Sequence, residues 1–200
     1  MSTDNIYISG TGLWIPPYGI TNDELMASYN AYVHKFNTEN AKEISAGTIE
    51  ELSPSSSEFV EKASGIKHRY VIEKKHSLDP NYMKPLIPAR DISELSLLAE
   101  IGVMAGKDAM KNAGITPNEV DAVIVSTANL QRAYPAIAIE IQNELGINGY
   151  GYDMMVACSS TTFGISNAMA DIAAGKAETI LVINPEITTA HNNMKSRESH

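Results

Sequence analysis

Cys158 is the residue best suited to covalent chemistry, and it is the only cysteine among the 200 residues. It ends the run Asp153-Met-Met-Val-Ala-Cys158, which predicts a strand, and small residues that predict a helix follow it. A helix N-terminus offers free N–H groups, and cysteines placed there have pKa values lowered from about 8.5 to roughly 3.5–7.5. The resulting thiolate is a nucleophile for acyl transfer. The alternative is a small buried apolar residue, because free cysteine is among the most buried residue types.

The elements on either side of this cysteine alternate between strand and helix. Apolar spacing and glycines predict a helix over 93–113 ending at Gly114, a strand over 120–126, a helix over 135–145 ending at Gly146, a strand over 150–157, a helix over 159–174 and a strand over 179–184. Such alternation predicts an α/β layered domain with a mostly parallel sheet flanked by helices.

The first 92 residues are less regular. Residues 6–12 predict a short strand, and Pro16 and Pro17 predict a loop. The spacing of Thr21 and Glu24 is that of a capping box at a helix start. Residues 37–57 predict a helix and a loop that cover a site or an interface. A second capping box then precedes a short helix that ends at Gly65. Residues 66–72 predict a strand, and residues 73–91 predict a loop.

Composition excludes several classes of function. The net charge is −9, from 15 basic and 24 acidic residues, so we expect no nucleic-acid partner. One cysteine excludes an internal disulfide and a cysteine zinc site, so we expect no metal. No apolar run approaches the roughly 18 residues of a membrane span, and the polar N-terminus does not resemble a signal peptide. These features predict a cytoplasmic protein without membrane insertion.

Several sequence motifs together resemble β-ketoacyl-ACP synthase III, a thiolase-fold condensing enzyme. They occur in the family's order and approximate spacing. The matching pieces are Ile8-Ser-Gly-Thr-Gly12 with Pro16, Ala63-Ser-Gly-Ile-Lys-His-Arg69, Val123-Ile-Val-Ser-Thr127, Tyr134-Pro135, Glu140-Ile-Gln142, Leu145-Gly-Ile147, Asp153–Ser159 and Ile183–Glu186. The resemblance implies a thiolase-like fold of which residues 1–200 form the N-terminal half.

The same resemblance implies a reaction. In this family the cysteine of the motif takes an acyl group from acyl-CoA, which would make Cys158 the nucleophile. Malonyl-acyl carrier protein (malonyl-ACP) then loses CO2 and condenses with the acyl group, and no cofactor is needed beyond acyl-CoA as substrate. The family's histidine and asparagine, which stabilise the enolate, match no motif here and are expected in the other half. We therefore expect no condensation by these 200 residues alone.

Three further residues carry over from the family. Tyr134 stands where an aromatic residue crosses a homodimer interface to line the partner's acyl pocket, and Arg197 stands where an arginine contacts the CoA nucleotide. Phe59 replaces a tryptophan found in many members and is able to stack on adenine, but Ala63 replaces an arginine. That departure, with the longer segments 35–57 and 73–91, favours a specialised member. An ordinary loop aromatic and a solvated surface arginine are the alternatives for Tyr134 and Arg197.

Other functions on the same fold stay open. One is non-decarboxylative thioester condensation, which in one group of relatives uses a glutamate base; residues 126–129 contain no glutamate, which counts against it. Another is specialised acyl transfer to oxygen or nitrogen. A non-catalytic, dimerising fragment is the remaining alternative, and a completely buried Cys158 would favour it.

Overall fold

The computed structural model describes residues 6–197 and 200, and the chain divides into two compact units. The sheet unit comprises Met1–Trp14 and Ala89–Glu186, and the α1 unit comprises Ile15–Pro88 and Ile187–His200. Each unit is therefore assembled from two stretches that are far apart in the sequence.

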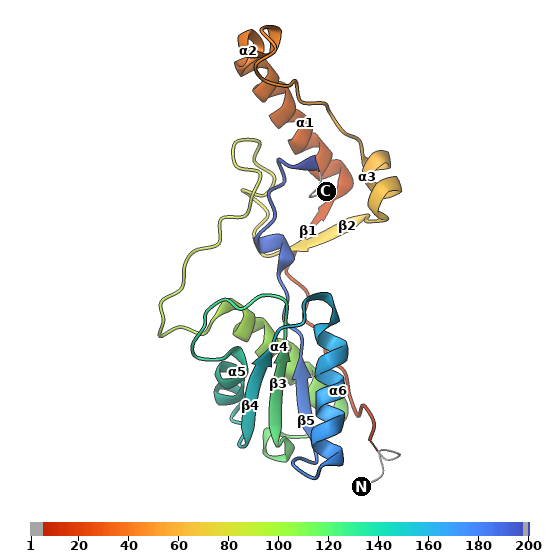
Figure 1. Ribbon diagram of the computed structural model, residues 1–200, viewed down its shortest axis with the longest axis vertical. Helices are drawn as coiled ribbons and strands as arrows, with labels where there is room; N and C mark the ends of the chain where they lie inside the picture. Colours follow the sequence, from red (N-terminus) through yellow and green to blue (C-terminus); the bar gives the residue numbers. More distant parts are fainter. Residues whose placement is uncertain (1–5, 198–199) are drawn as a thin grey trace. The chain divides into compact units, whose positions relative to one another are not determined.

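The sheet unit alternates strands and helices, as the sequence predicts (Figure 1). In chain order it contains α4 (Leu97–Ala113), the 3₁₀ turn η2 (Pro117–Glu119), β3 (Ala122–Ser126), α5 (Ile137–Leu145), β4 (Tyr150–Met154), the 3₁₀ turn η3 (Ala157–Ser159), α6 (Ser160–Ala173) and β5 (Ile180–Ile183). The strands lie in the order β4–β3–β5, and both pairs are parallel. The predicted α/β class with a parallel sheet flanked by helices is confirmed.

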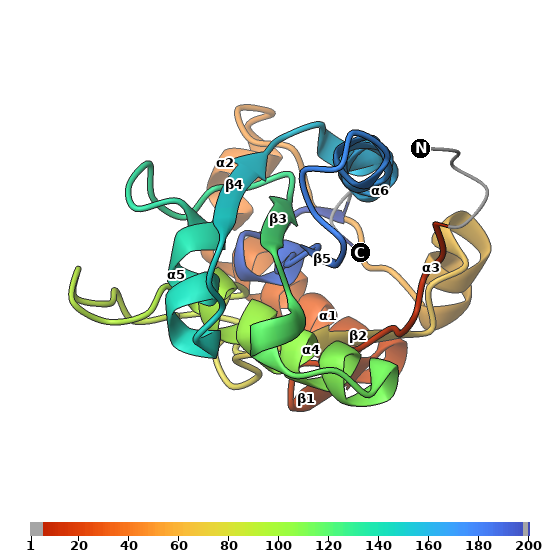
Figure 2. The ribbon, with the colours of Figure 1, turned by 90° about the horizontal axis from the view of Figure 1, so that it is seen from below.

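Helices cover both faces of this sheet, with α4 and α5 on one face and α6 on the other (Figure 2). Successive side chains of a strand point to opposite faces. Leu181 and Ile183 of β5 accordingly meet α4, whereas Val182 meets Gly164 of α6. The central strand β3 is buried along its whole length, because it is paired on both edges and covered on both faces.

The predicted ends of α4 and α5 are confirmed. Gly114 and Gly146 both adopt the left-handed conformation, with φ of 72° and 69°, and their N–H groups bond to carbonyls of the last helical turn. Left-handed φ carries no steric penalty for glycine. The two glycines therefore end the helices at the residues that the sequence indicates.

The predicted strand over residues 6–12 is wrong. This segment lies along α4 and forms no ladder with the sheet: the Asn112 side chain donates to the Thr11 carbonyl at 2.9 Å, and the Leu13 N–H donates to Asp108 at 3.0 Å. A Cβ on Gly12 would lie 2.2 Å from the Ala109 nitrogen. The glycines that suggested a strand end thus permit close contact with a helix.

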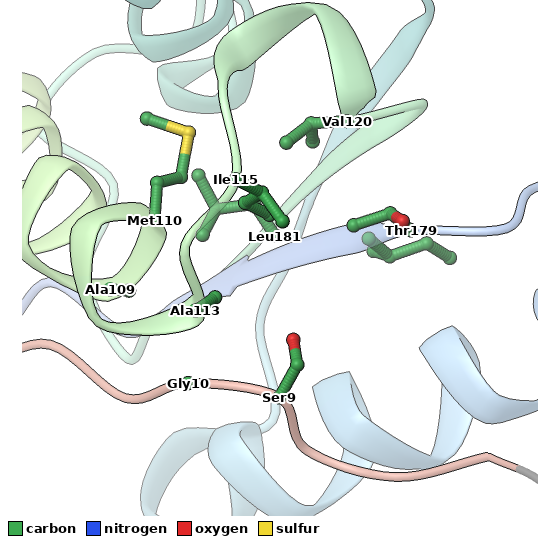
Figure 3. A pocket seen from close by; sticks show the side chains of 10 residues that line it. Ser9, Gly10, Ala109, Met110, Ala113, Ile115, Val120, Thr179 and Leu181 are labelled. Atoms are coloured by element: carbon green, nitrogen blue, oxygen red, sulfur yellow. The ribbon is translucent and has the colours of Figure 1, made fainter.

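A small cavity lies between this segment, α4 and the start of β5 (Figure 3). Its volume is about 50 Å³, and its lining includes Ser9, Met110 and Thr179. Small-molecule pockets measure roughly 300–1,000 Å³. The cavity also lies where β5 begins, at the edge of the parallel sheet opposite to the one where β4 leads to Cys158. It is therefore no candidate for the substrate site.

The α1 unit is built on a short antiparallel strand pair (Figure 1). It contains β1 (Tyr18–Thr21), α1 (Asn22–Glu39), α2 (Ala41–Ser45), α3 (Ser57–Ser64), β2 (His68–Val71) and the 3₁₀ turn η4 (Thr188–Ala190). The strand at 18–21 is not predicted from the sequence, because four residues that pair with a distant segment leave no local pattern. The helix starting after Thr21, the stop at Gly65 and the loop over 73–91 are confirmed.

Two asparagines of α1 bind the extended residues 50–56, which we call the strap. The Asn30 amide donates to the Ser55 carbonyl and accepts from the Ser55 N–H, both at 2.9 Å. Asn37 makes the same pair of bonds with Leu52, at 2.8 and 3.0 Å. Each asparagine thus replaces the backbone partner that a neighbouring strand would supply. Beneath them Leu25, Tyr29 and Val33 are buried in the core of this unit.

Candidate active site

Cys158 lies in the turn that joins β4 to α6. β4 ends at Met154, the chain turns through η3, and α6 begins at Ser160. Ala157, directly before the cysteine, has a φ of 47°, which is uncommon for a residue with a side chain. The turn therefore leaves Cys158 exposed beside the N-terminus of a helix of 14 residues. The alternative of a buried apolar cysteine is wrong, and the predicted strand ends three residues earlier than expected because the chain must turn here.

The side chain of Ser160 holds this turn to the end of β3. Its hydroxyl accepts from the Val156 N–H at 3.0 Å and lies 3.2 Å from the Thr127 carbonyl, to which it donates. The Thr127 N–H in turn donates to the Met154 carbonyl at 3.1 Å. The segments that follow β3 and β4 are therefore joined at the end of the sheet from which the Cys158 turn leaves.

Glu186 joins the segment after β5 to the same edge. Its carboxylate accepts from the Thr127 hydroxyl at 2.9 Å, from the Ala128 N–H, and from the Asn129 amide at 3.3 Å. Residues 126–129 contain no glutamate, but the structure brings Glu186 to them from 57 to 59 residues away. The available signal was its position just after a parallel strand, because the carboxyl ends of parallel strands meet at one edge.

Tyr134 stands on a loop that is fixed at its base and exposed at its tip. The Arg132 guanidinium donates to the carbonyls of Ile92 and Glu94 and lies 3.3 Å from the buried Glu140 carboxylate. Tyr134 itself is 84% exposed. The base of the loop is therefore fixed by Arg132, whereas the Tyr134 ring is exposed.

The helix after this loop begins on a carboxylate from β4. The two oxygens of Asp153 accept from the N–H groups of Ile137 and Ala138, each at 2.8 Å. Free N–H groups at a helix start favour a negative partner. Asp153, in the same motif as Cys158, therefore fixes α5 and the Tyr134 loop relative to the strand that leads to the cysteine.

The α1 unit brings together the other two expected site residues. The guanidinium carbon of Arg197 lies 4.3 Å from the centre of the Phe59 ring, and both side chains are exposed. This is a cation–π contact. Residues 138 positions apart thus form one exposed pair in which a guanidinium lies over an aromatic ring.

The described part of the chain holds no cluster of three or more histidine, cysteine, aspartate or glutamate side chains that would bind a metal ion. Across the same residues no helix is both long and apolar enough to cross a membrane.

The sequence profile of the thiolase N-terminal domain matches residues 80–200. Those residues include β3, β4, β5 and the Cys158 turn.

Individual relatives carry names of condensing enzymes. β-Ketodecanoyl-[acyl-carrier-protein] synthase of Pseudomonas aeruginosa is 51% identical over 175 residues, covering 88% of this chain and 50% of that protein. β-Ketoacyl-[acyl-carrier-protein] synthase III of Agrobacterium fabrum is 30% identical over 139 residues, covering 69% of this chain and 37% of that protein. The chain therefore spans half or less of the length of these relatives.

Solved structures share the fold. 3-Oxoacyl-[acyl-carrier-protein] synthase III of Aquifex aeolicus superposes with a TM-score of 0.68 at 22% identity, covering 96% of this chain and 48% of that one. OleA of Xanthomonas campestris, solved with lauric acid and lauroyl-CoA, gives 0.66 at 15% identity, covering 98% and 50%. The likeness in fold thus extends over nearly the whole chain and about half of each structure.

Proposed function

Because this chain belongs to the thiolase N-terminal domain family, we propose that it forms the N-terminal half of a β-ketoacyl-ACP synthase whose nucleophile is Cys158. The observation that carries this proposal is the exposed cysteine in a turn between a parallel strand and the N-terminus of α6. A sulfur in that position is open to substrate and lies close to the positive end of the helix dipole.

In the first step the Cys158 thiolate attacks the thioester carbonyl of acyl-CoA. A new carbon–sulfur bond forms to Cys158, the bond to the CoA sulfur breaks, and CoA leaves as a thiolate that takes up a proton. The acyl group is then held on the protein, which divides one difficult reaction into two easier ones.

In the second step the bond between the malonyl carboxylate and its methylene carbon breaks, and CO2 leaves. The electron pair stays on the methylene carbon, which attacks the acyl-cysteine carbonyl. The bond to the Cys158 sulfur then breaks, and the thiolate is regenerated with β-ketoacyl-ACP as product. The enolate needs aligned hydrogen-bond donors, which we propose are the histidine and asparagine of the other half.

We propose a medium-chain acyl donor. The Pseudomonas relative is named for a β-ketodecanoyl product, which has ten carbons. Condensation with malonyl-ACP adds two carbons, so an eight-carbon acyl-CoA would give that product. The identity of 51% makes this relative the better guide to chain length than the synthases III at about 30%.

We propose that Phe59 and Arg197 bind the nucleotide of CoA. Their stacked side chains offer a flat ring and a guanidinium, groups suited to adenine and phosphate. The missing arginine at Ala63 leaves Arg197 as the cation in this pair. A neutral alanine at residue 63 should weaken binding of the nucleotide phosphates relative to members that have the arginine.

We further propose a cytoplasmic homodimer in which Tyr134 reaches the acyl pocket of the partner. The exposure of Tyr134 on an anchored loop supports this role, and a single free cysteine fits a reducing compartment. In the full-length protein, light scattering at micromolar concentration tests the dimer, and a monodisperse monomer would refute it. Tyr134→Ala should alter the acyl-chain preference without changing stability; an unchanged profile would remove this role.

The full-length protein, incubated with acyl-CoAs of different lengths and analysed by peptide mass spectrometry, tests the main proposal. We expect an acyl adduct on the Cys158 peptide, fastest for the eight-carbon donor. Cys158→Ser should lose acyl loading by about three orders of magnitude or more, since a hydroxyl is a much weaker nucleophile than a thiolate. Ser159→Ala is the matched control, because Ser159 is the exposed neighbour of Cys158. Undiminished loading in Cys158→Ser would overturn the assignment.

A further inference from the structure

Three loops converge at the edge of the sheet that carries Cys158. They follow β3, β4 and β5, and they begin at Thr127, Met155 and Asn184. Parallel strands place these loops side by side, and one backbone bond, from the Thr127 N–H to the Met154 carbonyl, joins the start of the loop after β3 to the end of β4. The bonds that join the loop after β5 to the loop after β3 involve the side chains of Thr127, Asn129 and Glu186.

The Glu186 carboxylate binds the loop after β5 to the loop after β3, beside the bond from the Thr127 hydroxyl to the Pro185 carbonyl. It faces three donors, namely the Thr127 hydroxyl, the Ala128 N–H and the Asn129 amide. Hydrogen bonds to an ionised carboxylate are about twice as strong as neutral ones. Because Glu186 is exposed, these bonds, and not apolar packing, hold its side chain in place.

Thr127 transmits this contact to the cysteine turn. Its side chain is fully buried, and its hydroxyl lies 2.8 Å from the Pro185 carbonyl, 2.9 Å from Glu186 and 3.2 Å from the Asn129 carbonyl. Its one proton is shared among these acceptors, and the two nearest follow β5. On the opposite side its carbonyl accepts from Ser160, whose oxygen accepts from the Val156 N–H. Val156 and Ser160 are the two ends of the turn that contains Cys158.

We propose that Glu186 is a positioning residue for Cys158. It acts through Thr127 and Ser160 and holds the cysteine turn against the N-terminus of α6. This inference rests on the proposed role of Cys158 as nucleophile, and it adds a residue from the third strand to that site. Loss of the carboxylate should let the Thr127 loop move, and the Cys158 sulfur would move with it away from the N-terminus of α6. The helix N-terminus stabilises a thiolate, so this movement should disfavour the thiolate.

The sign of one measurement separates this role from a simple effect of charge. Removal of a nearby negative charge by itself favours the thiolate and would lower the pH midpoint of Cys158 alkylation. Removal of a tether that aligns the sulfur with the helix end would raise that midpoint. The measurement is the rate of iodoacetamide alkylation of the Cys158 peptide against pH in the full-length protein, together with acyl loading and the free energy of unfolding.

Four variants make the test specific. Glu186→Ala removes the tether and its charge, Glu186→Gln keeps an acceptor oxygen, and Thr127→Val removes the intermediate hydroxyl without changing charge. Glu178→Ala is the matched control, because Glu178 is an exposed glutamate two residues before the opposite end of β5.

We expect Glu186→Ala and Thr127→Val to slow acyl loading by about tenfold or more and to raise the alkylation midpoint. Glu186→Gln should lie between wild type and Glu186→Ala, and Glu178→Ala should match wild type. A lowered midpoint in Glu186→Ala, or unchanged rates, would overturn the positioning role. If the wild-type protein is not acylated at all, the proposed function fails, but the alkylation profiles still decide the role of Glu186.

Discussion

In both units a helix packs against extended backbone, but the residues that make the contact differ: glycines in the sheet unit and asparagines in the α1 unit. In the sheet unit, helices approach the sheet through glycines, and a Cβ on Gly164 would lie 2.4 Å from the Ser126 hydroxyl. In the α1 unit, a helix reaches the strap through the long amides of Asn30 and Asn37. A sheet supplies its own backbone hydrogen bonds, so a helix needs only shape to pack on it. The strap has no neighbouring strand to pair its backbone N–H and C=O groups, so side chains of the helix must supply those hydrogen bonds.

The sheet unit should be the more sensitive to added volume. Gly164→Ala places a methyl group against Ser126 on the buried strand β3, and we expect it to cost about 1–3 kcal/mol of unfolding free energy. Gly102→Ala is the matched control, because its methyl group meets the flexible end of Ile141. Urea denaturation measures both. An equal or larger loss in Gly102→Ala would contradict the idea that the contact with Ser126 of β3 sets the position of α6.

The α1 unit should respond locally to the loss of its asparagines. Asn30→Ala and Asn37→Ala each remove two side-chain bonds to the strap, and we expect each to cost about 1 kcal/mol. Hydrogen exchange should accelerate at the Ser55 and Leu52 amides, respectively, while β3 amides stay protected. Asn143→Ala serves as control, since Asn143 is an exposed residue of α5. Unchanged exchange at Ser55 and Leu52 would show that the asparagines do not hold the strap.

The smallest expected effect is a change in the pKa of one tyrosine, and a tyrosine of the other unit serves for comparison. Burial, aided by the hydrogen bond to Asp171, raises the pKa of Tyr150 from 10.0 to about 12. Burial also raises the pKa of Tyr32 in the α1 unit, with a contribution from Tyr29. A raised tyrosine pKa contributes stability below pH 10 that is lost as the pH rises through 12.

Asp171→Asn should therefore lower the pKa of Tyr150 toward 10 and leave Tyr32 unchanged. Tyrosine ring NMR shifts followed through alkaline pH, as far as the fold persists, measure both groups. An equal change at both tyrosines would indicate a general loosening of the chain, and no change at Tyr150 would exclude Asp171 as a cause of its raised pKa.

Local signals predicted the elements that have local causes. The Thr21–Glu24 capping box begins α1, and Gly114 and Gly146 end their helices, because caps involve residues within one turn of each other. The strand at 18–21 was missed and the one at 6–12 was wrong, since a strand forms only where a partner edge is available. β1 pairs with β2, whereas residues 6–12 pack along α4.

The residues of the candidate site divide in the same way. The sequence by itself determined the parallel α/β class and the position of Cys158 between a strand and a helix, because apolar periodicity and small residues are read along the chain. Only the tertiary structure decided that Cys158 is exposed, that Glu186 lies on the Thr127 loop and that Arg197 stacks on Phe59. These pairs are 59 and 138 residues apart, and contacts at such separation depend on how whole elements pack, which no local pattern records.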